Sequence, residues 1–208
     1  NNTIVIRNGI DLSRYHDDGK ARNKVRKELG ITEKAFVVGH VGRFFEPKNH
    51  EFLIKVFVEI KKKREDAFLL MIGDGNLKST IESKLHENGL SDSYMILSNR
   101  NDVPELLTAM DTFIFPSKVE GFGIALIEAQ AAGLKCVTST EVPDAACLTS
   151  LVEKKSLEDS PIEWCEAALK QRPTNWNKDA LNLYDMRREI RKLEDLYRKS
   201  GVCNQDGI

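Results

Sequence analysis

Five short apolar runs, separated by segments with helical hydrophobic spacing, most constrain what this chain can fold into. The first run, Ala35–Gly42, is nearly continuous in apolar residues, which is typical of a strand buried on both faces of a parallel sheet. Asn49–Lys62 then places its apolar residues three and four positions apart, as a helix does. Repeats of this unit predict a doubly wound α/β fold with a parallel sheet. The other predicted strands are 67–72, 94–97, 112–115 and 135–138, and the other predicted helices are 77–88, one starting at Asp102-Val103-Pro104 with Asp102 as its N-cap, and 122–132.

The two ends of the chain lie outside this alternation. Thr3–Asp11 starts with a β-branched run and reaches an Asn-Gly turn signal, and Lys20–Leu29 predicts a short basic helix closed by Gly30. The tail after about residue 156 is polar and helical. Residues 1–170 are therefore predicted to form one domain and residues 171–208 a helical extension. The predicted tail helices contain Trp164, Ala180–Tyr184 and Tyr184–Arg198.

The charge balance and the hydrophobic pattern exclude several classes of protein. The 208 residues carry 31 basic and 32 acidic side chains, a net charge of −1, so no basic field invites nucleic acid. No apolar run has the length of about 18 residues that a membrane span needs, and the first residues do not resemble a secretory leader. We therefore expect a cytoplasmic protein. Because the chain does not begin with Met, we expect it to be a fragment or a processed product.

The cysteines and histidines show no metal-site spacing. The cysteines lack a CxxC pair, so reduced thiols are favoured over zinc binding or a disulfide framework. Only one histidine, His40, falls in a predicted strand, where a structural role is favoured over a role at a site. The other histidines, in polar or helix-surface contexts, are His16, His50 and His86, and the cysteines are Cys136, Cys147, Cys165 and Cys203.

Four loops are predicted to meet at one edge of the sheet. Ligands of doubly wound sheets bind at the carboxyl ends of the strands. Loops with small, polar or charged residues follow four of the predicted strands, and parallel strands bring their carboxyl ends to the same edge. These loops are Gly42-Arg43, Gly73-Asp74-Gly75, Ser98–Asn101 and Ser117–Gly123.

A glycine-rich turn joins the strand 112–115 to the following helix. Gly121 and Gly123 let the backbone turn tightly and approach a ligand without a Cβ in the way. The free N–H groups of the next helix then offer an anion site. Glu120 precedes the turn, whereas Glu128 lies in an otherwise apolar helix, where a carboxylate is costly unless something binds it. The alternative is that Glu128 marks the solvent-facing stripe of that helix.

Two cations follow the first predicted strand. Arg43 can donate to two phosphate oxygens at once, and Lys48 adds a point charge near the start of the next helix. The alternative is a pair of exposed basic loop residues. The chain has neither a GxGxxG fingerprint with its acidic partner nor a GxxxxGK[ST] loop, which disfavours a nicotinamide dehydrogenase and a P-loop NTPase.

Several of these motifs, in this order, are similar to those of a known family. They are Val5–Asp11, Val41-Gly42-Arg43 with Lys48-Asn49, Ile72–Gly75, Arg100-x-Asp102-Val103, Phe115-Pro116-Ser117 and Glu120-Gly-Phe-Gly-x4-Glu128-Ala129-x3-Gly133. Over roughly residues 3–170 the chain resembles the C-terminal, donor-binding domain of a family-four retaining glycosyltransferase with the two-domain GT-B fold. Within that family it looks most similar to bacterial capsular and exopolysaccharide enzymes. Two departures, Ser98 for the usual Gly and Lys135 for the usual Pro, leave loop detail open.

The resemblance implies a role for each matching position. Arg43 and Lys48 would hold the diphosphate of a nucleotide sugar and stabilise the leaving nucleoside diphosphate, and Glu120 would contact the sugar ring. These three are the predicted catalytic residues. Glu128 would bind the ribose hydroxyls, and backbone groups near Arg100–Val103 would meet the base. The predicted donor-binding residues are Gly42, Arg43, Lys48, Arg100, Val103, Glu120, Gly121, Phe122, Gly123, Ile124 and Glu128.

The resemblance also implies partners and a mechanism. Transfer would retain the anomeric configuration and need no metal or cofactor, with the nucleotide sugar as substrate. An acceptor-binding N-terminal domain, not contained in these residues, would receive the helix Tyr184–Arg198, so the fragment is expected to be inactive alone. Peripheral association of the whole protein with the inner face of a membrane is an expectation of the same kind. Two alternatives stay open, which are a nucleotide-sugar epimerase-like domain and a non-catalytic nucleotide-binding or partner-binding module.

Overall fold

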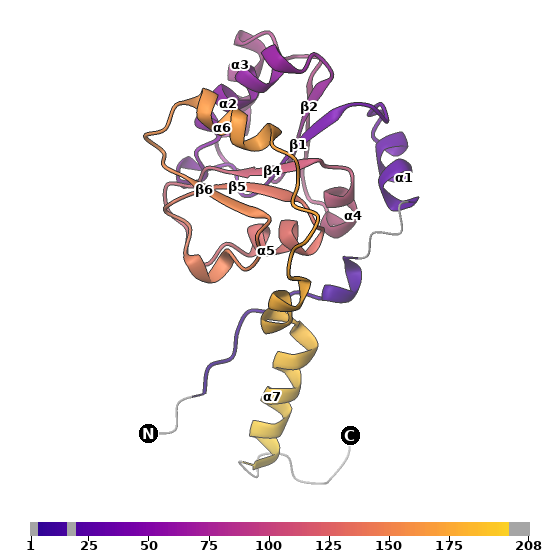
Figure 1. Ribbon diagram of the computed structural model, residues 1–208, viewed down its shortest axis with the longest axis vertical. Coiled ribbons are helices and arrows are strands. Elements are labelled where there is room, and N and C mark those ends of the chain that lie inside the picture. The colour runs from indigo at the N-terminus through magenta and orange to yellow at the C-terminus, as the bar shows by residue number, and fades with distance from the viewer. Residues whose placement is uncertain (1–3, 16–19, 200–208) are drawn as a thin grey trace.

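A six-stranded parallel sheet forms the centre of the molecule (Figure 1). The computed structural model describes residues 4–15 and 20–199. The sheet has the order β3-β2-β1-β4-β5-β6, and the direction of strand addition reverses between β1 and β4. The predicted doubly wound α/β fold is therefore confirmed. The strands are β1 (Phe36–Val41), β2 (Ala67–Ile72), β3 (Tyr94–Leu97), β4 (Thr112–Phe115), β5 (Lys135–Ser139) and β6 (Val152–Lys155).

Helices cover both faces of the sheet. On one face lie α2 (His50–Lys63), α3 (Lys78–Glu87) and α6 (Pro161–Leu169), and on the other lie α1 (Lys20–Glu28), α4 (Val103–Thr108) and α5 (Ile124–Ala131). Successive strand residues enter opposite cores: Val37 and Phe113 belong to the α1/α4/α5 side, and Val38 and Ile114 to the α2/α3/α6 side. Strands buried on both faces explain the continuous apolar runs in the sequence, and each such side chain contributes about 1.5–3 kcal/mol by burial.

The structure corrects the prediction at two elements. The strand β6 has no counterpart among the five predicted strands, because an edge strand with the sequence Val-Glu-Lys-Lys lacks the apolar signal of a buried one. The β-branched run at residues 4–9 lies outside the sheet, and Ile10 forms an isolated bridge with Asp185. The expected helix at Ala180–Tyr184 is a 3-10 helix, Lys178–Tyr184.

Of two local predictions, the one for Asp102 is confirmed only in part and the one for the cysteines is confirmed. Asp102 occupies the N-cap position of α4 but gives no side-chain cap, because its carboxylate pairs with Arg100. The cysteines of the described residues, Cys136, Cys147 and Cys165, are free thiols as predicted, and Cys203 and His16 lie outside the described residues.

The last helix, α7 (Met186–Lys199), extends away from the layered body (Figure 1). It is joined to the N-terminal segment, residues 4–15, by a hydrogen bond from Met186 N–H to Ile10 O and by one from Arg7 N–H to Glu189. Its apolar stripe is exposed and consists of Met186, Ile190, Leu193 and Tyr197. Within the described part of the chain, no helix combines the length and the apolar character that crossing a membrane requires.

Candidate functional site

A hollow of about 310 Å³ lies at the carboxyl ends of β1 and β4, where the strand order reverses. Such reversal points are where open α/β sheets bind ligands, because the loops on either side of them diverge. Seven of the eleven predicted donor-binding residues line the hollow. The lining residues are Val41, Gly42, Arg43, Lys48, Phe115, Glu120, Phe122, Gly123, Ile124 and Ala125.

An ion pair between Lys48 and Glu120 joins the β1 loop to the β4 loop. Lys48 Nζ donates to Glu120 Oε2, and the two side chains are only 15 % and 12 % exposed. Lys48 Nζ also lies 4.5 Å above the Phe115 ring, a favourable cation–π contact. Lys118 N–H donates to Pro47 O at 2.8 Å and holds the two loops together. The pair spans 72 positions of sequence, so the fold alone brings it together.

Arg43 lies at the same hollow but keeps its charge uncompensated. Its guanidinium is exposed and lies 5.9 Å above the Phe45 ring. No carboxylate among the described residues forms an ion pair with it. The hollow therefore presents one free cation beside one neutralised cation, which suits an anionic ligand.

Close backbone packing fixes the loop that carries Gly42 and Arg43. A Cβ on Gly73 would lie 2.0 Å from Gly42 O, and a Cβ on Gly75 would lie 2.4 Å from Phe44 O. Phe44 N–H in turn donates to Asp74 O at 2.8 Å. The β2 loop therefore packs directly against the backbone of the β1 loop. This close approach explains why Gly73 and Gly75 have no side chain.

The two glycines of the β4–α5 turn differ in backbone conformation. Gly123 has φ +90°, a left-handed conformation that favours glycine, and it immediately precedes α5 at Ile124. Gly121 has no positive φ, and a Cβ there would meet no atom within 4 Å. The N-terminus of α5 faces the hollow through Ile124 and Ala125, so its first N–H groups are available to a ligand.

Glu128 lies one helical turn beyond Ile124 and is engaged by Tyr15. The Tyr15 hydroxyl donates to Glu128 Oε1 at 2.9 Å. Glu128 does not line the hollow, and burial raises the pKa of its carboxyl while the Tyr15 hydrogen bond lowers it. The alternative of a solvent-facing stripe is wrong, because this carboxylate is half-buried and already bonded within the chain.

The predicted base-binding loop is held by charged side chains. The Arg100 guanidinium pairs with the Asp102 carboxylate, with Nε to Oδ1 at 2.6 Å. Arg14 Nη2 donates to Asn101 O at 3.1 Å and pairs with Glu105 at 3.2 Å. Arg100 and Val103 lie outside the hollow, so the structure separates them from the phosphate-side residues.

Two imidazoles lie buried beneath the β1 loop. His40 Nδ1 lies 2.9 Å from Ile114 O, and its ring centroid lies 4.7 Å from that of His50. Burial lowers the pKa of His40 to about 4 and that of His50 to about 2. The prediction of a helix-surface His50 is wrong, because its ring fits between His40 and Phe44 at the start of α2.

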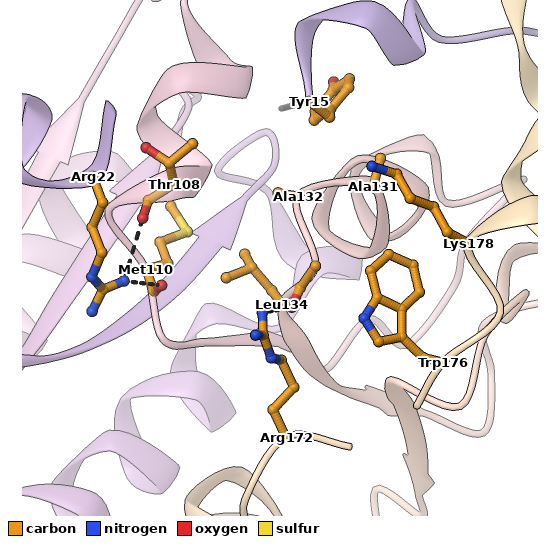
Figure 2. Close-up of a pocket in the computed structure, with 11 residues that line it drawn as sticks. Tyr15, Arg22, Thr108, Met110, Ala131, Ala132, Leu134, Arg172, Trp176 and Lys178 are labelled. Atoms are coloured by element: carbon orange, nitrogen blue, oxygen red, sulfur yellow. Dashed lines mark hydrogen bonds between the residues drawn. The ribbon is translucent and has the colours of Figure 1, made fainter. Parts of the chain in front are cut away.

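A second hollow of about 230 Å³ opens at the opposite edge of the sheet (Figure 2). Arg22 Nη1 donates to Met110 O at 2.8 Å and Arg172 Nη1 donates to Gly133 O at 2.7 Å. These carbonyls follow the ends of α4 and α5, where cations are favourable. The arginines thus stabilise two helix ends, and no predicted site residue lines this hollow.

Two residues without a predicted role, Phe115 and Tyr15, contact predicted site residues, although Tyr15 itself lines the second hollow and not the first. Phe115 was part of a matching motif but had no assigned role, and it proves to lie under Lys48. Tyr15 had no signal at all, because its partner Glu128 is 113 positions away. Pattern reasoning finds residues that share a local motif, whereas contacts of this range depend on the fold.

Comparison with known proteins identifies the family. Residues 21–161 match the family described as glycosyl transferases group 1. EpsF of Bacillus subtilis (strain 168), which is named as a glycosyltransferase, is 35 % identical over 165 residues, 78 % of this chain and 42 % of EpsF. An Escherichia coli enzyme, UDP-Gal:alpha-D-GlcNAc-diphosphoundecaprenol alpha-1,3-galactosyltransferase, is 28 % identical over 207 residues, 93 % of this chain and 53 % of the enzyme. The chain thus spans about half the length of these curated relatives.

Solved structures agree on the fold. The chain superimposes on Anabaena HepE, crystallised with UDP and glucose, with a TM-score of 0.76 and 20 % identity, over 94 % of this chain and 56 % of that one. WaaG, a glycosyltransferase involved in lipopolysaccharide biosynthesis, gives a TM-score of 0.69 and 24 % identity, over 91 % of this chain and 51 % of WaaG. These neighbours have the same α/β architecture, which is one half of the GT-B fold. The chain belongs to the glycosyl transferases group 1 family.

Proposed function

We propose that this chain is the donor-binding domain of a retaining glycosyltransferase. It binds a nucleoside-diphosphate sugar and contributes to transfer of the sugar to a glycan or lipid-linked acceptor in polysaccharide biosynthesis. The observation that carries the proposal is the hollow between β1 and β4, where the uncompensated Arg43 and the Lys48–Glu120 pair face the N-terminus of α5. Family membership favours sugar transfer over the epimerase-like and non-catalytic alternatives.

Each part of the hollow suits one part of the donor. Arg43, Lys48 and the α5 N–H groups bind the diphosphate and stabilise the negative charge that develops on it as the sugar leaves. Gly121 supports this assignment, because it has no positive φ and no contact of the described residues requires a glycine there, since a Cβ would extend into open space. A closely approaching ligand explains why that position is small.

The Lys48–Glu120 pair has a double role in this proposal. Without a donor the two charges neutralise each other, and a diphosphate competes with Glu120 for the Lys48 ammonium. Glu120 then becomes free to accept hydrogen bonds from hydroxyl groups of the sugar. Arg43, Lys48 and the helix N-terminus together supply positive charge at the leaving group, and on this ground we propose transfer without a metal ion.

The acceptor side belongs to a part of the protein outside these residues. The chain has about half the length of its curated relatives, and the exposed stripe of α7 suits packing against another domain. We therefore propose that residues 171–208 form the extension that joins this domain to an N-terminal acceptor domain. Residues 1–170 then form the donor domain, which does not turn over alone.

Titration calorimetry with UDP, GDP and ADP, in buffer without divalent metal, tests the proposal. We expect one nucleoside diphosphate to bind, and Arg43→Ala to lower its affinity at least about tenfold, as loss of a charge-assisted contact does. Arg43 is exposed, so the melting temperature of the variant should match that of the parent chain. Lys118→Ala, which removes a nearby exposed cation paired with Glu46, is the matched control. Equal affinities in the parent chain and Arg43→Ala would refute the phosphate role.

A further inference from the structure

Tyr15, which belongs to none of the sequence motifs, connects the N-terminal segment to Glu128. Tyr15 is 4 % exposed, and its hydroxyl donates to Glu128 Oε1 at 2.9 Å. The residue ends the turn formed by the 3-10 helix Leu12–Arg14, which Asp11 caps by accepting from Ser13 N–H at 3.1 Å. The short helix thus sets where the tyrosine ring enters the core, and Figure 2 shows Tyr15 above the end of α5.

The preceding residue, Arg14, contacts the predicted base-binding loop. Arg14 donates to Asn101 O at 3.1 Å, within the loop that leads into α4, and pairs with Glu105 at 3.2 Å. Two consecutive side chains, Arg14 and Tyr15, therefore tie the N-terminal segment to the loop before α4 and to α5. The segment therefore contacts both of these elements, which also pack against the sheet.

The hydrogen bond leaves half of the Glu128 carboxylate unused. Tyr15 occupies Oε1, and no group of the described residues donates to Oε2. A carboxylate offers about four acceptor positions, so a half-buried one with a single donor has capacity for hydroxyl groups of a ligand. Glu128 lies one turn along α5 from Ile124 and Ala125, which line the hollow, so a ligand that fills the hollow can extend toward it.

We propose that Tyr15 is a positioning residue for the donor: it holds Glu128 with Oε2 directed to the hydroxyls of the ribose, and so determines the preference for a ribonucleoside diphosphate. The inference rests on the proposed function, since it concerns the same site. Tyr15 does not touch the reacting atoms. It acts through Glu128, by restricting the rotamers of that side chain and by opposing the rise in its pKa that burial causes.

A thermodynamic cycle between protein and ligand tests this role. Affinities of the parent chain and of Tyr15→Phe are measured for UDP, GDP and ADP and for their 2′,3′-dideoxy forms. The substitution removes one hydroxyl and keeps the buried ring, so folding is preserved and is checked by the melting temperature. We expect Tyr15→Phe to weaken the ribonucleotide by about five- to tenfold and to leave the dideoxynucleotide unchanged.

Tyr184→Phe is the matched control. Its hydroxyl also makes one hydrogen bond, to Ala145 O at 3.0 Å, and its ring packs on Phe122. This variant loses a bond of the same kind without touching Glu128, so the ratio of ribonucleotide to dideoxynucleotide affinity should equal that of the parent chain. A merely structural role of Tyr15 would make the two variants behave alike.

The pH dependence gives an independent readout. The Tyr15 hydrogen bond lowers the pKa of Glu128, so its loss raises that pKa. Ribonucleotide binding by Tyr15→Phe should then be lost at a higher pH on acidification than binding by the parent chain, and dideoxynucleotide binding should show no such difference.

The outcomes separate this inference from the proposed function. A parent chain that prefers the ribonucleotide, with the same preference in Tyr15→Phe, overturns the role of Tyr15 and leaves the donor site standing. A parent chain that binds both nucleotide forms equally overturns the inference, because Glu128 then does not read the ribose. A parent chain that binds none of the six nucleotides removes the proposed function and the inference together.

Discussion

At the scale of single residues, the site is defined by charges that the fold pairs or leaves unpaired. Lys48 is neutralised by Glu120 in a nearly buried pair, whereas Arg43 meets no carboxylate of the described residues. The same loop covers two neutral imidazoles, His40 and His50, whose burial opposes protonation. These differences lead to two predictions.

Glu120→Gln should strengthen diphosphate binding while it lowers the stability of the domain. The substitution removes the carboxylate that competes for Lys48, so we expect affinity for the nucleoside diphosphate to rise about fivefold. An unpaired, nearly buried ammonium should also lower stability by about 1–2 kcal/mol, and the bound diphosphate should restore it. Calorimetry and urea unfolding with and without ligand check both effects. Lys48→Met is the control that should lose affinity, and a lower diphosphate affinity in Glu120→Gln would contradict the competition.

Acid should destabilise the chain through His40 and His50. Both have folded-state pKa values below the ordinary 6.5, at about 4 and about 2, so the unfolded state binds more protons below pH 6.5. The contribution of each imidazole to the free energy of unfolding is therefore fully present above pH 6.5 and is lost as the pH falls toward 4. Between pH 7 and pH 5 we expect a loss of about 2 kcal/mol per imidazole. Urea unfolding at pH 7, 6 and 5 measures the slope. His50→Leu should have a shallower slope, and an identical slope in the variant would show that folding leaves the pKa of His50 unchanged.

At the scale of secondary-structure elements, the edge strand β6 depends on charge pairing as much as on burial. Lys135 of β5 is only 8 % exposed, and its ammonium lies 2.8 Å from Glu153 of β6. Glu153 also accepts from Lys170, just after α6, at 2.7 Å. The carboxylate thus links two neighbouring strands to the helix that covers them.

Glu153→Ala and Lys170→Ala should differ in cost although both break the same cluster. Glu153→Ala leaves a nearly buried ammonium without its partner, and we expect a loss of about 2–3 kcal/mol. Lys170 is 58 % exposed, so Lys170→Ala should cost no more than about 1 kcal/mol. The free energy of unfolding in urea gives both values. Equal losses would mean that Lys135 finds another partner or reaches water in the variant.

At the scale of the whole molecule, α7 extends away from the layered body (Figure 1), and the apolar stripe of this helix is exposed. Exposed apolar patches of this kind mark surfaces that bind other protein. The N-terminal segment and the start of α7 are joined at Ile10, so both ends of the described chain lead to one side of the domain.

Isolated chains should associate through this stripe at high concentration. Ile190→Glu and Leu193→Glu place charges on it without touching the layered body, so we expect monomers with unchanged melting temperature. Light scattering after gel filtration measures the mass of the parent chain and of each variant. Ile162→Glu, on an exposed apolar residue of α6, is the control that should leave association as it is. Monomeric parent chains at high concentration would contradict the prediction.

The sequence by itself determined the alternation of strands and helices, because strands buried on both faces must be continuously apolar and helices must repeat every three to four residues. It also predicted the loops that end at one sheet edge, since that convergence follows from parallel strands. The roles of Arg43, Lys48, Glu120 and Glu128 remain predictions that the geometry makes testable. Only the tertiary structure decided the sixth strand, whose Glu153 pairs with Lys135 of the neighbouring strand and with Lys170 after α6. It alone decided which carboxylate neutralises Lys48 and that Tyr15 engages Glu128, because contacts across 72 and 113 positions have no local pattern.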